Sequence, residues 1–250
     1  MASQAAPRLA GEDVSATRPR PGPPARSQPV TSLAEQYARL ARETPGRAAV
    51  DFELRVLDVF FSGLFLLLFL PIAAVIAALI LATSGRPLFY RGERVGRGGR
   101  IFTMTKFRTL RPGAEARIGR HLGPALVEHT DSEVTRVGRR LRATQLDEIP
   151  QLWNVFKGDM SLVGPRPIRP RFFEELANEL PAYWQRLVVR PGLTGFAQVR
   201  RGYETSMVEK LAHDLEWIAD RSVPLYLRTL GSTAWRVALQ SLRGVFGAPA

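Results

Sequence analysis

VFFSGLFLLLFLPIAAVIAALILATSG, residues 59–85, is the stretch that decides the fold of this 250-residue chain. Its 27 residues include no charged side chain. A straight helix of this length would reach about 40 Å, which is enough to cross a bilayer. We therefore expect a membrane segment here, and we set its limits at residues 51–85.

Pro71 lies near the middle of this stretch. Because proline lacks an N–H group and clashes with the preceding turn, the helix should bend or break there. One topology is a kinked helix that spans the membrane, which length and composition slightly favour. The other is a re-entrant hairpin, whose halves of about 18 Å enter and leave by the same face. Basic residues flank the stretch on both sides. Because basic flanks favour the cytoplasmic side of a membrane, this pattern leans toward a re-entrant hairpin with both ends in the cytoplasm.

Basic side chains dominate the sequence that follows the apolar stretch. The chain has a net charge of +12, and residues 86–171 contain 18 Lys and Arg against 8 Asp and Glu. Such a field attracts nucleic acid, anionic lipid or phosphorylated substrates, although a solvated basic surface is the plain alternative. The absence of cysteine excludes disulfides, Cys-zinc sites, iron–sulfur clusters and cysteine nucleophiles. The chain has three histidines, and so small a number disfavours a His-rich metal site.

The rest of the chain divides into a tail and one domain. Residues 1–50 are rich in Ala, Pro, Arg and Ser, so we expect a disordered or weakly structured tail, with a short helix over 32–46. Residues 86–250 should form a mostly helical α/β domain. Its expected elements are strands within 88–105 around a turn at 96–100, a polar loop with a short helix over 111–135, helices over 144–157 and 170–187, a turn-rich loop over 189–196, and an amphipathic helix over 225–245. That last helix either packs on the core or lies on anionic lipid.

The block TRVGRRLRATQLDEIPQLWNVFKGDMSLVGPRP, residues 135–167, holds an adjacent pair of carboxylates, Asp147 and Glu148. Thr144 is expected to cap a helix that starts near this pair, with Pro150 in its first turn. The free N–H groups at a helix start stabilise carboxylates and also bind phosphate. One carboxylate can then face a phosphorus atom while the other holds a metal ion or a proton. Taken alone, such a pair is more often helix-start charge than a catalytic site.

Several motifs in a fixed order resemble the bacterial sugar transferase family, the monotopic polyprenyl-phosphate phosphoglycosyl transferases. They are RVLD at 55–58 with the proline-split apolar stretch behind it, RPLFYRGERVGRGGRIFTMTKFRTL at 86–110, the acidic block at 135–167, and RPGLTGFAQV at 190–199. The resemblance covers residues 55–230 and leaves out the N-terminal tail. Because separate motifs recur in the right order, this match is far more specific than any single motif.

This resemblance implies a small cytoplasmic catalytic domain mounted on a proline-broken, re-entrant membrane helix, with interfacial amphipathic helices. Asp147 matches the family's nucleophile and Glu148 its partner, and both match ligands of a Mg²⁺ cofactor. Pro71 matches the proline that breaks the membrane helix. The residues that match phosphate- or substrate-binding positions are Arg142, Arg166, Lys106 and Arg108.

The implied reaction moves a hexose-1-phosphate from a UDP-sugar to polyprenyl (undecaprenyl) phosphate. It proceeds through a covalent aspartyl-phosphosugar, releases UMP, and is the first membrane step of exopolysaccharide or glycoconjugate synthesis. A carboxylate and a diphosphate repel by about 4 kcal/mol at 4 Å and an effective dielectric of 20, which arginines and Mg²⁺ offset. The implied location is the bacterial inner membrane, with the domain in the cytoplasm. The implied partners are the two substrates and the bilayer, without nucleic acid, and self-association is left open.

Two alternatives and three departures accompany this interpretation. The alternatives are a non-catalytic, membrane-anchored basic module that binds nucleic acid or anionic lipid, and a scaffold that keeps the fold without the activity. An acidic pair inside an arginine cluster disfavours a polyanion binder. The departures are Leu70 in place of a small residue before the proline, Gly92 in place of a common glutamine, and the lack of an aspartate near Tyr226.

Two further acidic residues are assigned structural roles. Asp58 is expected to cap the membrane helix or to pair with an arginine such as Arg55. Asp159 is expected to be a turn residue or a member of a polar network.

Overall fold

The computed structural model describes residues 46–118, 129–196, 199 and 206–246. The predictions for the tail up to residue 45, namely disorder over 1–30 and the helix over 32–46, fall outside this part of the chain. The first described element is α2 (Ala48–Ser84), a helix of 37 residues. It begins three residues before the predicted membrane segment and ends one residue before the predicted limit.

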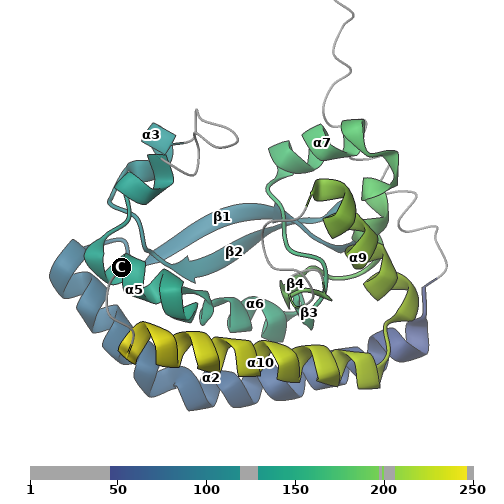
Figure 1. The fold of residues 1–250 in the computed structure, drawn as a ribbon, viewed down its shortest axis with the longest axis horizontal. Coiled ribbons are helices and arrows are strands. Elements are labelled where there is room, and N and C mark those ends of the chain that lie inside the picture. Colours follow the sequence, from purple (N-terminus) through teal and green to yellow (C-terminus); the bar gives the residue numbers. More distant parts are fainter. Residues whose placement is uncertain (1–45, 119–128, 197–198, 200–205, 247–250) are drawn as a thin grey trace, which may run out of the picture.

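Helix α2 continues without interruption through Pro71. It runs along the lower edge of the molecule in Figure 1, and its C-terminal part turns away from the line of its N-terminal part. The prediction of a bend is therefore confirmed and the prediction of a break is wrong. A proline removes one hydrogen bond from the ladder, and a long helix accommodates this loss by bending.

The two faces of α2 differ in what they contact. One face packs on the domain through the buried residues Leu54, Ile76 and Ile80. The other face leaves large apolar side chains exposed, including Phe52 at 70% and Leu67 at 72%. An 18-residue window of α2 has a mean hydropathy of 3.1, and 11% of that window is buried. Because a core helix of a soluble protein would bury such a surface, α2 has the length, composition and exposure of a membrane helix.

A β-hairpin follows α2. Strand β1 (Phe89–Val95) pairs antiparallel with β2 (Ile101–Phe107), so that Phe89 lies opposite Phe107. The short 3₁₀ helix η1 (Arg97–Gly99) makes the turn, as predicted for residues 96–100. A second, parallel pair joins β3 (Ser161–Val163) to β4 (Gly192–Thr194). The loop predicted over 189–196 thus contains a strand, which is too short for side-chain alternation to reveal.

The domain is mostly helical, as predicted. Its remaining described elements are α3 (Ala114–Ile118), α5 (Arg136–Thr144), η2 (Leu146–Glu148), α6 (Gln151–Lys157), α7 (Pro170–Glu179), η3 (Pro181–Val188), α9 (Met207–Asp220) and α10 (Val223–Phe246). The helix predicted over 144–157 is split, because Gln145 adopts a left-handed conformation with φ of 57°. Thr144 ends α5 and caps no helix start, whereas Thr135 caps α5 by accepting a hydrogen bond from the Gly138 N–H at 2.9 Å.

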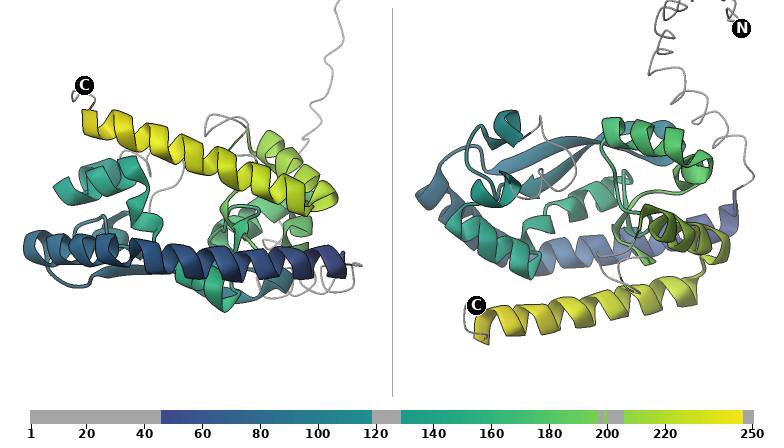
Figure 2. Two further views of the ribbon diagram at one scale, coloured as in Figure 1. Left: turned by 90° about the horizontal axis from the view of Figure 1, so that it is seen from below. Right: turned by 45° about the horizontal axis from the view of Figure 1, so that its top comes forward.

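Helices α2 and α10 lie along the same side of the molecule, and the hairpin, α7 and α9 lie on the other side (Figure 1). Seen from below, α2 and α10 run in the same direction and diverge toward their C-terminal ends (Figure 2). The main hydrophobic core joins α2, β2, α6, β3 and α10 through residues such as Met104, Val155, Leu162 and Tyr226. The sheets and helices of the domain thus rest on a pair of long helices.

Helix α10 confirms the amphipathic helix predicted over 225–245. Tyr226 and Thr229 are buried on its inner face, so the prediction that it packs on the core is confirmed. Its outer face exposes Leu227, Trp235 and Leu239. The surface of α10 that points away from the core is therefore apolar in part.

The N-terminal end of α2 is bonded to the last part of the domain. The Asp51 carboxylate accepts hydrogen bonds from the Arg221 guanidinium at 2.7 and 3.3 Å. Arg47 donates to the carbonyl oxygens of Ala219 at 2.6 Å and Arg221 at 3.3 Å. These contacts hold the start of α2 at the junction of α9 and α10.

A buried carboxylate links the first half of α2 to the core. Asp58 is 1% exposed, and one of its oxygens accepts hydrogen bonds from the Ser161 hydroxyl at 2.9 Å, the Leu162 N–H at 2.8 Å and the Tyr226 hydroxyl at 2.9 Å. Arg55 instead donates to carbonyl oxygens of α6. The predicted cap or arginine pair is therefore replaced by a junction of α2, β3 and α10.

Candidate active site

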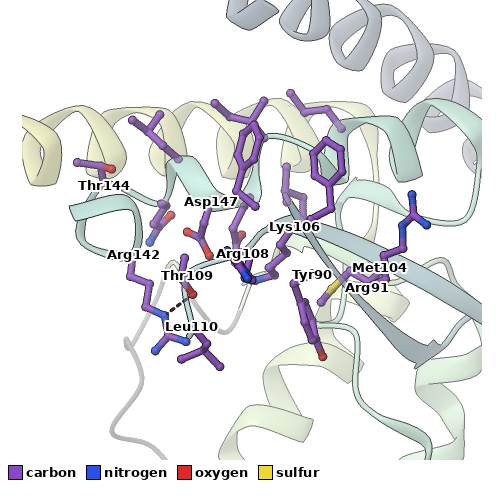
Figure 3. A pocket seen from close by; sticks show the side chains of 18 of the residues that line it. Tyr90, Arg91, Met104, Lys106, Arg108, Thr109, Leu110, Arg142, Thr144 and Asp147 are labelled. Atoms are coloured by element: carbon purple, nitrogen blue, oxygen red, sulfur yellow. Dashed lines mark hydrogen bonds and ion pairs between the residues drawn. The ribbon is translucent and has the colours of Figure 1, made fainter. Parts of the chain in front are cut away.

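All of the predicted site residues of the domain line one large cavity. Its volume is about 1290 Å³, and its lining includes Lys106, Arg108, Arg142, Asp147, Glu148 and Arg166. These residues come from β2 and the segment after it, from α5, from η2 and from the loop after β3. Figure 3 shows Asp147, Arg142, Lys106 and Arg108 gathered in this cavity. Residues far apart in the sequence are thus brought to one place.

The acidic pair lies on a short 3₁₀ turn between two helices. The left-handed conformation of Gln145 ends α5, and η2 follows at once with Leu146, Asp147 and Glu148. Pro150 then forms the N-cap of α6, close to the position predicted for it. Because proline has no N–H to bond to the preceding turn, α6 does not extend back through Pro150. The acidic pair therefore lies on a tight turn outside both helices.

Asp147 is a buried carboxylate with an elevated pKa. It is 8% exposed, and burial raises its pKa to about 6, with a further upward contribution from Glu148 and opposing effects of Lys106 and Arg142. Among the described residues, no other residue donates a hydrogen bond to its carboxylate. A carboxylate that is ionised near neutral pH, more basic than usual and not engaged by other residues has the properties of a nucleophile.

Glu148 has the opposite surroundings. Its Oε1 atom lies 2.5 Å from Lys106 Nζ and 3.5 Å from Arg166 Nη2. Burial alone would raise its pKa, but Lys106 and Arg166 outweigh burial and hold that pKa below the usual range. Glu148 therefore stays charged and fixes two cations at the edge of the cavity. Two neighbouring carboxylates whose pKa values are pushed apart are suited to different roles.

Arg142 is oriented by a residue that the sequence analysis did not single out. Its Nε atom donates to Thr109 Oγ1 at 3.0 Å, the contact drawn as a dashed line in Figure 3. Helix α5 can approach Thr109 because residue 138 is glycine, where a Cβ atom would come within 2.1 Å of Thr109 O. The position of Thr109 directly after Lys106, Phe107 and Arg108 is the signal that could have indicated its role.

Arg108 lines the cavity but bonds to the C-terminal end of α2. Its Nη2 atom donates to the carbonyl oxygens of Ser84 and Gly85, both at 2.7 Å, and its Nη1 atom donates to that of Arg86 at 3.1 Å. Its Nε atom is buried without a partner. A cation at a helix C-terminus satisfies free carbonyl groups and complements the helix dipole. The structure thus favours a structural role for Arg108 over the predicted binding of phosphate.

Further cations extend the cavity on the hairpin side. Arg91 and Arg94 of β1 and Arg169 before α7 line it together with Arg166. None of these three was predicted as a site residue, although Arg91 and Arg94 lie in the family motif at 86–110. Because they lie on strands and loops apart from the acidic block, their convergence depends on how the hairpin is placed over α6.

The acidic groups of the cavity are the side chains that could hold a magnesium ion there. Asp147 and Glu148 are the carboxylates among its described lining residues, and no group of three or more His, Asp or Glu converges in the part of the chain that the structure describes. Mg²⁺ commonly takes one or two protein carboxylates and completes its shell with water and substrate phosphates. The pair therefore suits an ion that binds together with a phosphorylated substrate.

Comparison with known proteins identifies relatives of the chain. Residues 50–240 match the sequence model of a family described as bacterial sugar transferase. A Caulobacter vibrioides protein named UDP-glucose:undecaprenyl-phosphate glucose-1-phosphate transferase is 42% identical over 197 residues, which cover 74% of this chain and 71% of that protein. The exopolysaccharide production protein ExoY of Rhizobium meliloti is 33% identical over 183 residues, or 68% of this chain and 78% of ExoY.

A third relative differs in the sugar that its name specifies. The Aeromonas hydrophila UDP-N-acetylgalactosamine-undecaprenyl-phosphate N-acetylgalactosaminephosphotransferase is 37% identical over 175 residues. The match covers 69% of this chain and 40% of that protein, so the chain spans about two fifths of the length of this relative. The names of the Caulobacter and Aeromonas proteins specify the same carrier lipid, undecaprenyl phosphate, and two different sugars.

Proposed function

Since the chain belongs to the bacterial sugar transferase family, we propose that it transfers a hexose-1-phosphate or N-acetylhexosamine-1-phosphate from a UDP-sugar to undecaprenyl phosphate. The observation that carries this proposal is the setting of Asp147. Its carboxylate is buried, has a pKa of about 6, and lies in a cavity whose charged lining residues, apart from Glu148, are cationic among those that the structure describes. This setting fits a nucleophile that attacks a diphosphate.

In the first proposed step, an oxygen of Asp147 attacks the phosphorus that carries the sugar. A bond forms between this oxygen and phosphorus, and the bond between that phosphorus and the bridging oxygen of the diphosphate breaks. The electron pair leaves with UMP. The enzyme then holds the sugar phosphate as an acyl phosphate on Asp147.

In the second proposed step, a phosphate oxygen of the lipid attacks the same phosphorus. The bond between phosphorus and Asp147 breaks, so the carboxylate is restored and the product is a lipid-linked diphosphate sugar. Covalent catalysis divides one difficult transfer into two displacements, each of which uses the same cations.

The surrounding side chains position and neutralise the phosphates. Arg142, held by Thr109, presents its Nη atoms to one side of the cavity. Lys106 and Arg166, held by Glu148, present positive charge on another side. Guanidinium groups can bind phosphate through two parallel hydrogen bonds. A Mg²⁺ ion held by Asp147 and Glu148 together with the substrate would supply further charge neutralisation of the diphosphate.

The attachment of α2 supports a topology in which the protein enters the membrane from one side. Arg221 and Arg47 bond the N-terminal end of α2 to the domain, and Arg108 bonds its C-terminal end to the same domain. A helix with both ends held by one domain has both ends on one side of the bilayer. The basic excess over residues 86–171 favours the cytoplasmic side of the bacterial inner membrane. The proposed enzyme therefore works at the lipid boundary, where its second substrate lies.

The test is release of UMP by the purified, membrane-embedded chain. With a UDP-sugar and Mg²⁺ alone, we expect a burst of UMP that matches the enzyme concentration, and with undecaprenyl phosphate added we expect turnover. Mass spectrometry should find a phosphosugar on the peptide that contains Asp147. Asp147→Asn should lower UMP release by about a thousand-fold or more, because an amide is not a nucleophile.

Asp159→Asn serves as the matched control. Asp159 pairs with Lys157 at 2.8 Å and accepts from Asn154, which confirms its predicted place in a polar network, and it does not line the cavity. This variant should keep its UMP release within about two-fold. Wild-type activity in Asp147→Asn would contradict the proposed nucleophile.

Cysteine labelling tests the topology, because the chain has no native cysteine. Ala49→Cys and Glu93→Cys introduce thiols at exposed positions before and after the membrane stretch. Both thiols should be protected from an impermeant reagent outside intact cells and should react after lysis. Labelling of one position alone from outside would indicate a spanning helix.

A further inference from the structure

The cavity that contains Asp147 has an apolar arm. Phe65 and Phe69 of α2 line the cavity, and so do Leu230 and Val237 of α10. Phe65, Phe69 and Leu230 are partly buried side chains that pack against the main core on one side and border the cavity on the other. The total volume of about 1290 Å³ exceeds the roughly 300–1,000 Å³ typical of a pocket for one small ligand.

The polar groups along this arm are satisfied within the protein. The hydroxyl groups of Thr194 and Thr233 lie 2.8 Å apart, and the Thr233 hydroxyl also bonds to the Thr229 carbonyl at 2.9 Å. Arg236, another lining residue, donates to the carbonyl of Val199. Because these hydroxyls are engaged by each other and by α10, this stretch suits a hydrocarbon better than a sugar or a nucleotide.

The two helices that form the arm also carry the exposed apolar surface. Leu67 of α2 is 72% exposed and Trp235 of α10 is 69% exposed, both outside the arm. The helices diverge when seen from below, and the domain is visible between them (Figure 2). A hydrocarbon chain leaving the arm would therefore pass between two helices whose outer faces suit lipid.

The charged end of the same cavity suits a phosphate. Helix α5, whose last turn carries Arg142, packs against α10, so the arm and Arg142 are neighbours. A ligand that fills both parts needs an anionic head and a hydrocarbon tail. Of the two substrates in the proposed reaction, the lipid phosphate has this chemistry.

We propose that the arm between α2 and α10 binds the first isoprenoid units of the acceptor lipid, and so delivers its phosphate to the Arg142 side of Asp147. This inference rests on the proposed function, because that function supplies a lipid phosphate as the second substrate. Phe65 and Phe69 form one wall, and Leu230 and Val237 form the other. The inner face of α10 is then a determinant of acceptor binding.

The decisive variant is Leu230→Gln in the full-length, membrane-embedded enzyme. It makes one wall of the arm polar and leaves the charged residues intact. The burst of UMP without acceptor should stay within two-fold of wild type, whereas the KM for undecaprenyl phosphate should rise by about ten-fold. With a phosphate that carries a single isoprenoid unit, the variant and the wild type should differ by less than three-fold.

Leu227→Gln is the matched control. It makes the same change three residues earlier on α10, at a position that is 43% exposed and does not line the cavity. Its KM for undecaprenyl phosphate should stay within two-fold of wild type. An equal rise in both variants would overturn the inference, because it would show a general effect on membrane attachment.

A second variant covers the case in which Leu230→Gln loses its UMP burst through misfolding. Val237→Trp keeps the wall apolar and fills the arm, so it should raise the KM for the long acceptor and preserve the burst. An unchanged KM in a variant that retains the burst would overturn the inference and leave the proposed function intact. Absence of the burst in the wild type would instead overturn the proposed function.

Photo-crosslinking of the wild type gives a readout independent of turnover. The probe is a prenyl phosphate with a diazirine in its second isoprenoid unit, presented in vesicles. We expect adducts on Phe65, Phe69, Leu230 or Val237, assigned to single residues by tandem mass spectrometry and reduced by excess undecaprenyl phosphate. Adducts confined to the exposed faces of α2 and α10 would show lipid contact without entry into the arm and would overturn the inference.

Discussion

Asp58 and Asp147 are both buried carboxylates, and they differ in how their oxygens are engaged. Asp58 is 1% exposed and accepts three hydrogen bonds, from Ser161, Leu162 and Tyr226. Asp147 is 8% exposed, lies in a large cavity, and receives no hydrogen bond from another described residue. Burial raises the pKa of Asp147 to about 6.

This difference indicates a structural role for Asp58 and a chemical role for Asp147. A buried carboxylate with donors all around it joins elements and cannot leave its partners without cost. A buried carboxylate that lacks such donors destabilises the free enzyme. Because its oxygens are not engaged and cations lie nearby, it is available to react with a phosphorylated substrate. The predictions below test this contrast, from the largest expected effect to the smallest.

Removal of the Asp58 carboxylate should have the largest effect on stability. Asp58→Ala leaves two hydroxyls and one N–H without their acceptor, so the free energy of unfolding should fall by about 3 kcal/mol or more. Denaturation in detergent or nanodiscs measures this change, with Asp159→Ala, which removes a partly buried ion pair, as the control at under about 1 kcal/mol. If Asp58→Ala kept full stability but released no UMP, Asp58 would act in the reaction and its structural role would be contradicted.

Removal of the Asp147 charge should stabilise the protein. The folded-state pKa of about 6 lies above the unfolded value of about 4, so the folded protein binds more protons between these values and loses stability as pH rises through them. Asp147→Asn has no such loss. It should therefore be more stable than wild type by roughly 2–3 kcal/mol above pH 6 without Mg²⁺, and the difference should vanish near pH 4.

The same pKa predicts a pH dependence for the first step. Only the ionised carboxylate of Asp147 is a nucleophile, so the rate of the UMP burst should increase with pH through about 6 and then level off. Rapid-quench measurements from pH 5 to 8 provide this profile. A rate that is flat across this range would show that the carboxylate is already ionised at pH 5 and would contradict the elevated pKa of Asp147.

Arg108 and Arg142 extend the contrast to cations. Arg108→Gln removes the hydrogen bonds to the C-terminal end of α2, and we expect a loss of about 2 kcal/mol in stability. Arg142→Gln removes a guanidinium that is held by Thr109 in the cavity, so it should raise the KM for substrate and change stability by under about 1 kcal/mol. Melting temperatures and UMP kinetics of both variants separate the roles, and an exchange of these two outcomes would contradict the assignment.

The smallest expected effect comes from one donor at the Asp58 junction. Tyr226→Phe removes the hydroxyl that bonds to Asp58 at 2.9 Å and keeps the ring in the core. Since two donors remain on the same oxygen, stability should fall by about 1 kcal/mol. A loss as large as that of Asp58→Ala would show that Tyr226 alone holds the junction.

Much of the site could be predicted from the sequence because its motifs are contiguous. The segment KFRT, the acidic pair, Arg142 shortly before that pair, and the arginine between two prolines supplied the six side chains that the cavity brings together. The hairpin was predictable too, since its turn is rich in glycine and its strands are local partners. The β3–β4 pair was not, because a three-residue strand has no periodic signature and its partner is distant in the chain.

The roles of individual residues depended on distant contacts. Thr144 was expected to cap a helix, but the left-handed Gln145 ends α5 there, and this conformation has no strong signal in a glutamine. Arg108, which the resemblance matches to a phosphate- or substrate-binding position, also bonds to carbonyl oxygens at the end of α2, a contact that the sequence does not indicate. Thr109 and Asp58 gain their roles from Arg142 and from Tyr226, which lie elsewhere in the sequence.

The sequence by itself determined that an apolar helix precedes a basic domain with a paired carboxylate, because these features are local runs of residue types. The tertiary structure decided which of the two buried carboxylates accepts hydrogen bonds and which receives none from another described residue, that α2 bends without breaking, and that both of its ends return to one domain. The physical reason is that desolvation, hydrogen-bond saturation and helix attachment depend on groups brought close by folding, and residue order alone does not specify these distances.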